Sequence, residues 1–186
     1  MLSFVWSFFL IAIAEMGDKT QLVALSFATK YKPTKVLLGI FIGTIVVHLF
    51  SVIIGERVSA LIPLNYLKIL IGLSFVGFGI WTLKGDSCKE KGKKGNKLGP
   101  ILTVAIAFFL AELGDKTQLA TISLAAQYHS FLGVWLGSTF GMVAADGIAI
   151  VVGIIAGKKL PEKLIKYVST AIFIIFGVLI IIDAVR

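Results

Sequence analysis

The octapeptide EMGDKTQL at residues 15–22 returns almost unchanged as ELGDKTQL at residues 112–119, and Met16 against Leu113 is the one difference. Each copy places two carboxylates and a lysine inside a segment that is otherwise apolar enough to lie in lipid. Ionisable side chains within a membrane are costly and usually functional. The repeated octapeptide is therefore the candidate for the working site, and it also organises the rest of the chain.

The composition places the chain in a membrane. Of its 186 residues, 58% are hydrophobic and only 15% are charged, and the mean hydropathy is +0.97. Such values are typical of a polytopic membrane protein and exclude an ordinary soluble domain. We expect a single membrane domain over residues 1–186, and no enzymatic activity.

Outward from the octapeptides, the sequence predicts six apolar helices that cross a bilayer. They cover residues 2–29, 36–54, 64–83, 100–126, 131–156 and 164–182. The connector at residues 84–99 is rich in lysine and glycine, which predicts a flexible loop. The predicted fold class is therefore all-α, with six transmembrane helices.

The two halves of the chain resemble each other beyond the octapeptides. A G-x-x-x-G pattern occurs at residues 39–43 and again at residues 133–137, a spacing that favours close helix packing. A duplicated unit of three helices, residues 1–83 and 100–186, accounts for these matches. Because three is odd, the second unit enters the membrane from the opposite side, which predicts an inverted repeat of the kind found in secondary transporters.

The basic residues give an independent prediction of topology. The net charge of +8 could suggest nucleic acid, but most lysines lie in short connectors at residues 30–35, 84–97 and 158–166. All three connectors fall on the same side of the six-helix arrangement. The positive-inside rule then places both termini outside and the central loop in the cytoplasm, and we expect no nucleic-acid partner.

The first apolar segment is too long to cross a bilayer as a straight helix. Residues 2–29 would span about 40 Å, whereas the hydrocarbon core is about 30 Å thick. A tilt or a break is therefore expected, with Gly17 and Gly114 as the weak points. On an unbroken helix, Glu15 would share a face with Asp18, because positions i and i+3 are neighbours.

The octapeptides supply oxygen ligands and no sulfur, a set that suits Ca²⁺, Mn²⁺ or Mg²⁺ better than a soft metal. The candidate metal ligands are Glu15, Asp18, Glu112 and Asp115. Supporting polar groups are Thr20, Gln21, Thr117 and Gln118. The candidate counter-ions are Lys19 and Lys116. Crowded carboxylates at low dielectric also hold protons tightly, so protons and a divalent ion would compete for such a site.

Other interpretations of these residues stay open. The acids could instead form structural ion pairs one turn along a helix, Glu15 with Lys19 and Glu112 with Lys116, and the lysines could snorkel toward an interface. Asp146 fits a place in the site or on a proton path as well as a hydrogen-bonded structural role. His48 is more typical of an interhelical hydrogen bond than of a proton relay.

The twice-repeated E-x-G-D-K-T, on the first helix of each half, resembles the GDT family of cation/proton exchangers. That family includes eukaryotic Golgi calcium/manganese transporters and bacterial manganese exporters. The resemblance covers essentially the whole chain. It implies that Glu15, Asp18, Glu112 and Asp115 bind the cation, and that Mn²⁺ or Ca²⁺ is exchanged for protons. In lacking a long amino-terminal extension, the chain resembles the shorter prokaryotic members of the family. We therefore expect the protein to lie in a prokaryotic cell membrane.

These observations predict a divalent-cation/proton antiporter that works by alternating access and exports the cation from the cytoplasm. No resident cofactor is expected, although the transported metal would be bound in passing. A passive cation channel and an exporter of a small organic cation are the alternatives, and a purely structural role is a third. Association of two copies is left open.

Overall fold

The computed structural model describes residues 1–16, 18–84, 99–156 and 162–185. These residues form eight α-helices and no strand, so the all-α prediction is confirmed for the part of the chain that is described. The helices are α1 (Leu2–Glu15), α2 (Lys19–Lys30), α3 (Pro33–Leu61), α4 (Leu64–Lys84), α5 (Pro100–Glu112), α6 (Lys116–Tyr128), α7 (Phe131–Ala156) and α8 (Glu162–Val185).

Two of the predicted segments are each divided into two helices at the octapeptide. α1 and α2 together cover the first predicted segment, and α5 and α6 cover the fourth. Met16 has φ −62° and ψ 126°, and Leu113 has φ −65° and ψ 116°, so the residue after each glutamate is extended. Gly114 follows with φ +78°, a left-handed conformation that glycine adopts at little cost. The expected break at Gly114 is confirmed, and Gly17 lies outside the described residues.

Because both helices are interrupted, the face-sharing relation of an unbroken helix does not apply to the acids. The backbone N–H of Asp18 instead donates to the carbonyl oxygen of Glu15 at 3.1 Å, and that of Asp115 donates to Glu112 at 3.2 Å. Each bond closes a short turn. The two acids of each octapeptide are therefore held next to each other by the break itself.

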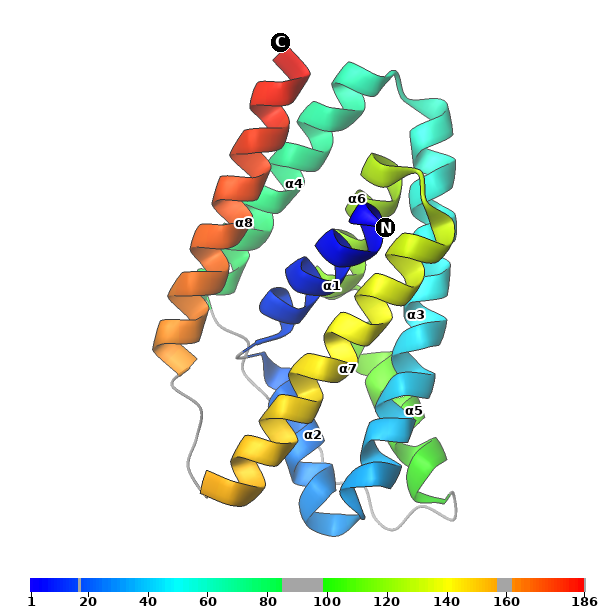
Figure 1. Ribbon diagram of the computed structural model, residues 1–186, viewed down its shortest axis with the longest axis vertical. Coiled ribbons are helices and arrows are strands. Elements are labelled where there is room, and N and C mark those ends of the chain that lie inside the picture. Colours follow the sequence, from blue (N-terminus) through cyan, green and yellow to red (C-terminus); the bar gives the residue numbers. More distant parts are fainter. Residues whose placement is uncertain (17, 85–98, 157–161, 186) are drawn as a thin grey trace.

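The chain runs repeatedly between two ends of an elongated molecule (Figure 1). Both termini and the α3–α4 and α6–α7 connections lie toward the upper end, and the α2–α3 connection lies at the lower end. α1 and α6 occupy the upper half, whereas α2 and α5 occupy the lower half. The two octapeptides consequently lie near mid-height.

The long helix of each half packs on the divided helices of the other half. α3 lies against α5 and α6, and α7 lies against α1 and α2. A Cβ at Gly43 would lie 2.6 Å from the carbonyl oxygen of Ala105, and one at Gly137 would lie 2.5 Å from that of Phe4. The prediction that the G-x-x-x-G glycines serve close helix packing is confirmed.

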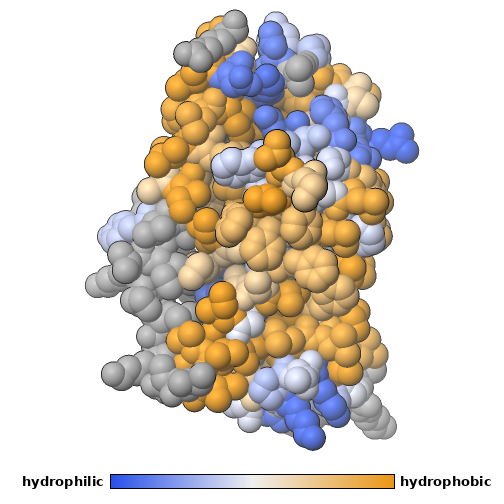
Figure 2. All heavy atoms as spheres, viewed as in Figure 1, coloured by the Kyte–Doolittle hydropathy of each residue, from blue (hydrophilic) through white to orange (hydrophobic). Residues whose placement is uncertain are grey.

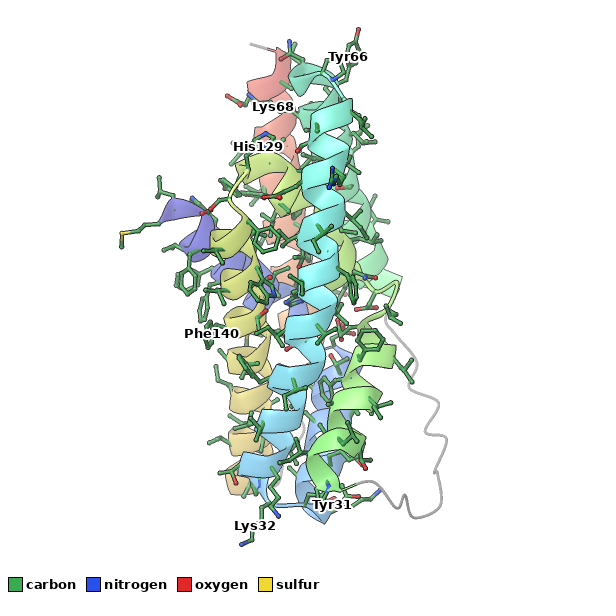
Figure 3. All side chains as sticks on the ribbon, turned by 90° about the vertical axis from the view of Figure 1, so that its right-hand side faces the viewer. Tyr31, Lys32, Tyr66, Lys68, His129 and Phe140 are labelled. Atoms are coloured by element: carbon green, nitrogen blue, oxygen red, sulfur yellow. The ribbon has the colours of Figure 1, made fainter. Side chains whose placement is uncertain are left out.

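The surface has an apolar band between two polar ends. Figure 2 shows this band on one face, with hydrophilic side chains gathered above and below it. Lys32 marks the lower end and Lys68 and His129 the upper end, while Phe140 points outward between them (Figure 3). α3 and residues 131–154 of α7 are long and apolar enough to cross a membrane, and shorter apolar stretches lie in α1, α4, α5 and α8.

Candidate functional site

The two breaks bring polar side chains from both halves into the interior. The buried residues of the octapeptides are Glu15, Asp18, Thr20, Gln21, Glu112, Asp115, Lys116 and Thr117. Gln118 is partly buried, and its side-chain oxygen accepts a hydrogen bond from the backbone N–H of Gly114 at 2.6 Å. The side chain of Lys19 lies outside the described part of the structure. The two acidic clusters are thus turned inward, away from the lipid-facing surface.

An ion pair joins the two octapeptides directly. The Nζ atom of Lys116 lies 3.0 Å from Oδ2 of Asp18, and these residues are only 5% and 4% exposed. The sequence suggested Glu112 as a structural partner for Lys116 within the same helix. The partner that the structure gives it is an aspartate of the opposite half, because the break at Gly114 reorients the start of α6.

Each glutamate is fixed by a threonine five residues later. The hydroxyl of Thr20 donates to the carboxylate of Glu15, and the hydroxyl of Thr117 donates to that of Glu112. The second carboxylate oxygen of each glutamate is buried and has no hydrogen-bond partner within the described residues. Each half therefore offers one oriented glutamate with one oxygen that can still accept a proton or a cation.

α7 contributes a fifth buried acid beside the octapeptides. The side-chain amide of Gln21 donates to the carbonyl oxygen of Ala145 at 3.0 Å, which holds α2 against the turn of α7 that carries Asp146. Both carboxylate oxygens of Asp146 are buried without a hydrogen-bond partner in the described chain. Among the described residues, no hydrogen bond supports the structural role considered for Asp146.

His48 forms a separate polar contact between α3 and α7. Its Nδ1 atom lies 3.4 Å from the hydroxyl of Thr139, and its Nε2 atom is buried with no partner among the described residues. Thr139 was not predicted as a site residue. Its position seven residues before Asp146, and so on the same face of α7, was the available signal.

The buried charges are strongly unbalanced. Five buried carboxylic acids face one described ammonium, that of Lys116. The Glu15 carboxyl group is close enough for Coulomb interaction with three other acids and with Lys116. The acids are Glu112, Asp146 and Asp18, so acids of both halves interact electrostatically. Burial of a bare charge costs several kcal/mol, so protons or a further cation must neutralise the surplus.

The arrangement is not a closed metal site. Within the described ranges, no three His, Cys, Asp or Glu side chains converge closely enough to hold a metal ion. Asp18 is engaged by Lys116 instead. The oxygen ligands suit a hard divalent ion, but the side chains would have to move toward one another to enclose it.

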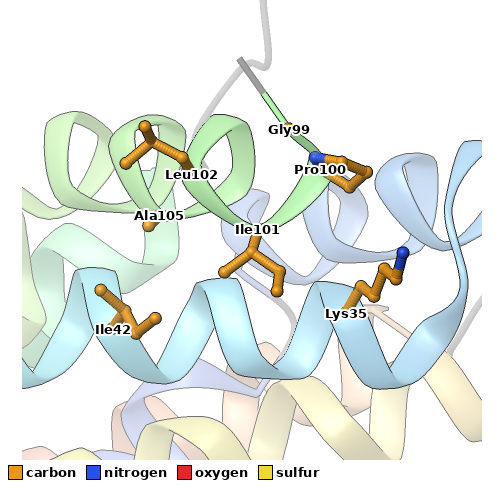
Figure 4. Close-up of a pocket in the computed structure, with 7 residues that line it drawn as sticks. All are labelled: Lys35, Ile42, Gly99, Pro100, Ile101, Leu102 and Ala105. Atoms are coloured by element: carbon orange, nitrogen blue, oxygen red, sulfur yellow. The ribbon is translucent and has the colours of Figure 1, made fainter.

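A hollow of about 270 Å³ lies elsewhere on the molecule, at the seam between α3 and α5 (Figure 4). It is lined by Lys35, Ile42, Gly99, Pro100, Ile101, Leu102 and Ala105. The lining is almost entirely apolar and contains no carboxylate. This hollow therefore offers no acidic ligand for a cation, in contrast to the buried acids of the octapeptides.

Comparison with known proteins gives a consistent result. The model of the family described as "Divalent cation/proton antiporter GDT1" matches residues 3–90 and 100–186. A Vibrio cholerae protein named "Putative manganese exporter" is 36% identical over 90% of this chain and 84% of its own length. A rice protein, "GDT1-like protein 1, chloroplastic", is 31% identical over 98% of this chain and 62% of its own length. No solved structure matches the chain.

Proposed function

Because the chain belongs to the GDT1 family of divalent cation/proton antiporters, we propose that it exports Mn²⁺ or Ca²⁺ from the cytoplasm in exchange for protons. The observation that carries this proposal is the meeting of the two octapeptides. Carboxylates from both halves are buried together at mid-height, and Lys116 of one half pairs with Asp18 of the other. The name of the Vibrio cholerae relative, "Putative manganese exporter", supports manganese as the cation.

The proposed cation ligands are the four acids of the octapeptides, Glu15, Asp18, Glu112 and Asp115. Thr20 and Thr117 orient the two glutamates by hydrogen bonding, and Gln21 fixes α2 against α7. Gln118 binds the backbone at the break, where it supports the turn. A divalent ion could bind only when these acids have lost protons, and reprotonation would expel it, which couples the two fluxes.

Asp146 and His48 are the proposed proton path. Asp146 lies beside the acids on α7 and has no hydrogen-bond partner among the described residues. His48 lies between α3 and α7, bound to Thr139 two turns before Asp146. Protons could therefore pass along the α3–α7 interface without crossing the cation ligands.

The proposed architecture is six membrane crossings in two inverted repeats, residues 1–83 and 100–186. α1 with α2, and α5 with α6, would each count as one interrupted crossing. The reciprocal packing of α3 on α5 and α6, and of α7 on α1 and α2, supports this assignment. Interrupted helices at mid-membrane are typical of the ion sites of secondary transporters.

The contacts of α4 and α8 in the upper half support alternating access. α4 and α8 pack together as a pair, and this pair contacts α6 and α1 in the upper half. Ser74 of α4 lies 3.1 Å from Ser123 of α6, and the ring of Trp6 lies 5.9 Å from that of Phe176. We infer from these contacts that the described conformation is closed in the upper half.

The basic connectors indicate which side of the membrane each end of the molecule faces. The α2–α3 connection, with Lys30, Lys32 and Lys35, lies at the lower end. The positive-inside rule assigns that end to the cytoplasm, with both termini outside. The central connector, of which residues 85–98 lie outside the described part, would then be cytoplasmic. The conformation described would face inward in a prokaryotic cell membrane.

Exchange can be tested in proteoliposomes that contain a pH dye. Addition of Mn²⁺, Ca²⁺ or Mg²⁺ to one side should move protons in the opposite direction, and an imposed pH gradient should drive the metal uphill. Metal flux that follows voltage without proton movement would indicate a passive channel instead. Competition by a small organic cation but by none of the metals would indicate an exporter of organic solutes.

A further inference from the structure

We propose that the ammonium of Lys116 is a tethered surrogate for the transported cation. It would occupy Asp18 when no ion is bound, and an incoming divalent ion would have to displace it. Lys116 would then be a positioning residue that sets the affinity and the charge selectivity of the site. This inference rests on the proposed function, because it concerns how the same acids receive their cation.

The local structure gives no reason for a lysine at this position. Lys116 is the first residue of α6, and Asp115 is the residue before the helix. The start of a helix carries a partial positive charge, which disfavours a cation there. Burial of an ammonium is also costly unless it is paired. The reason must therefore lie outside α6.

The partner across the halves supplies that reason. Nζ of Lys116 lies 3.0 Å from Oδ2 of Asp18, and both side chains are almost fully buried. Glu15 and Asp115 also attract the Lys116 ammonium electrostatically. Three of the four proposed cation ligands thus act on this one ammonium, which lies where a cation would be favoured.

The same contact explains why the acids are not arranged around an ion. No three described acidic or histidine side chains converge as metal ligands, and Asp18 is held by Lys116. A lysine is suited to leave, because its ammonium is a point charge on a flexible four-carbon stem. Withdrawal of Lys116 would remove this ion pair, and Asp18 could then turn toward Glu15 and the acids of the second octapeptide.

Displacement has a consequence for selectivity. A monovalent ion that replaces the ammonium brings the same charge and gains no Coulomb energy, whereas a divalent ion brings twice the charge. Lys116 would therefore exclude Na⁺ and K⁺ while admitting Mn²⁺ or Ca²⁺. Lys19 has the equivalent place at the start of α2, but its side chain lies outside the description, so the proposal concerns Lys116.

The test is equilibrium binding of Mn²⁺ to purified full-length protein at alkaline pH, measured from the electron paramagnetic resonance signal of free Mn²⁺. Lys116→Gln removes the competing cation and should lower the Kd for Mn²⁺ by about tenfold. In this variant, but not in the wild type, Na⁺ should compete with Mn²⁺. An unchanged or higher Kd, with no competition by Na⁺, would overturn the proposal.

Lys116→Arg is the matched variant that keeps the charge. Its guanidinium can donate two hydrogen bonds to the Asp18 carboxylate and is therefore harder to displace. The Kd for Mn²⁺ should rise above that of the wild type. Should Lys116→Gln fail to fold, as judged by gel filtration, this variant decides: an unchanged or lower Kd would contradict displacement. If the wild type binds no Mn²⁺ and neither Ca²⁺ nor Mg²⁺ drives proton movement in the proteoliposomes, the proposed function fails first, and the inference fails with it.

Discussion

The two threonine-bound glutamates show how single residues prepare the site. Thr20 and Thr117 each satisfy one oxygen of a buried glutamate, and the second oxygen is left without a partner in the described chain. A purely structural acid would be expected to satisfy both oxygens, because a buried carboxylate oxygen without a partner destabilises the fold. The arrangement therefore favours binding of a proton or a cation over stability.

The first prediction concerns the two glutamates as an equivalent pair. Glu15→Gln and Glu112→Gln should each reduce Mn²⁺/H⁺ exchange in proteoliposomes by about tenfold or more, a barrier change of ~1.4 kcal/mol, because each removes one titratable ligand. Glu56→Gln is the control, since Glu56 lies on α3 and belongs to neither octapeptide, and it should leave exchange unchanged. If only one of the two glutamates mattered, a site shared between the halves would be wrong.

The second prediction separates a proton path from a structural role for Asp146. Asp146→Asn removes a buried carboxyl group that has no hydrogen-bond partner among the described residues. The variant should unfold at the same temperature as the wild type or higher, because no hydrogen bond among the described residues is lost. Exchange should nevertheless slow, while equilibrium binding of Mn²⁺ is largely retained. A lower unfolding temperature with normal exchange would assign Asp146 to structure.

At the scale of elements, the decisive feature is the interruption of two helices at the octapeptides. Both interruptions have an extended residue after the glutamate and a backbone hydrogen bond from the aspartate N–H to the glutamate carbonyl. The interruption exposes helix ends and directs two acids inward. The repeated motif therefore forms the same turn, from the aspartate N–H to the glutamate carbonyl oxygen, in both halves.

The third prediction tests the backbone at one interruption. Gly114 has φ +78°, and a Cβ there would meet no atom within 4 Å, so the cost of Gly114→Ala is conformational and not steric. The expected loss is about 1 kcal/mol of unfolding free energy, measured by denaturation in detergent.

Gly77→Ala is the matched control for this substitution. A Cβ at Gly77 also meets no atom within 4 Å, but Gly77 lies within the regular helix α4. Alanine should be neutral or slightly stabilising there. Equal effects of the two substitutions would contradict a conformational requirement at Gly114.

The interruption of the helices was predictable from the sequence, whereas some contacts between helices were not. Apolar segment lengths and the position of Gly114 predicted a break, because a straight helix would exceed the bilayer. The partner of Lys116 was not predictable, since Glu112 is its neighbour along a helix whereas Asp18 lies in the other half. The contact between His48 and Thr139 also depends on how α3 crosses α7, and apolar periodicity does not fix that crossing.

At the scale of the whole molecule, the pair formed by α4 and α8 is the candidate moving body. The two helices approach closely at Gly72 and Gly177, and Lys68 of α4 forms an ion pair of 2.6 Å with Asp183 of α8. In the described part of the chain, the pair contacts α6 and α1 in the upper half. An inverted repeat would allow the mirrored arrangement, with contacts to α2 and α5 in place of α6 and α1.

The fourth prediction fixes the pair in the observed position. In a background in which the one cysteine of the sequence, Cys88, is replaced by serine, Ser74→Cys and Ser123→Cys place two thiols where two hydroxyls lie 3.1 Å apart. Oxidation of this double variant should stop exchange, and a reducing agent should restore it. Each single variant serves as the control. Full exchange by the cross-linked protein would mean that α4 does not separate from α6 during transport.

The central claim is that acids of both halves form one site where a divalent ion replaces protons. Proton release on addition of Mn²⁺ to purified protein in weakly buffered detergent solution tests this claim most directly. We expect release from the wild type, and a smaller release from both Glu15→Gln and Glu112→Gln. Binding of Mn²⁺ without proton release, or a reduction confined to one half, would contradict it.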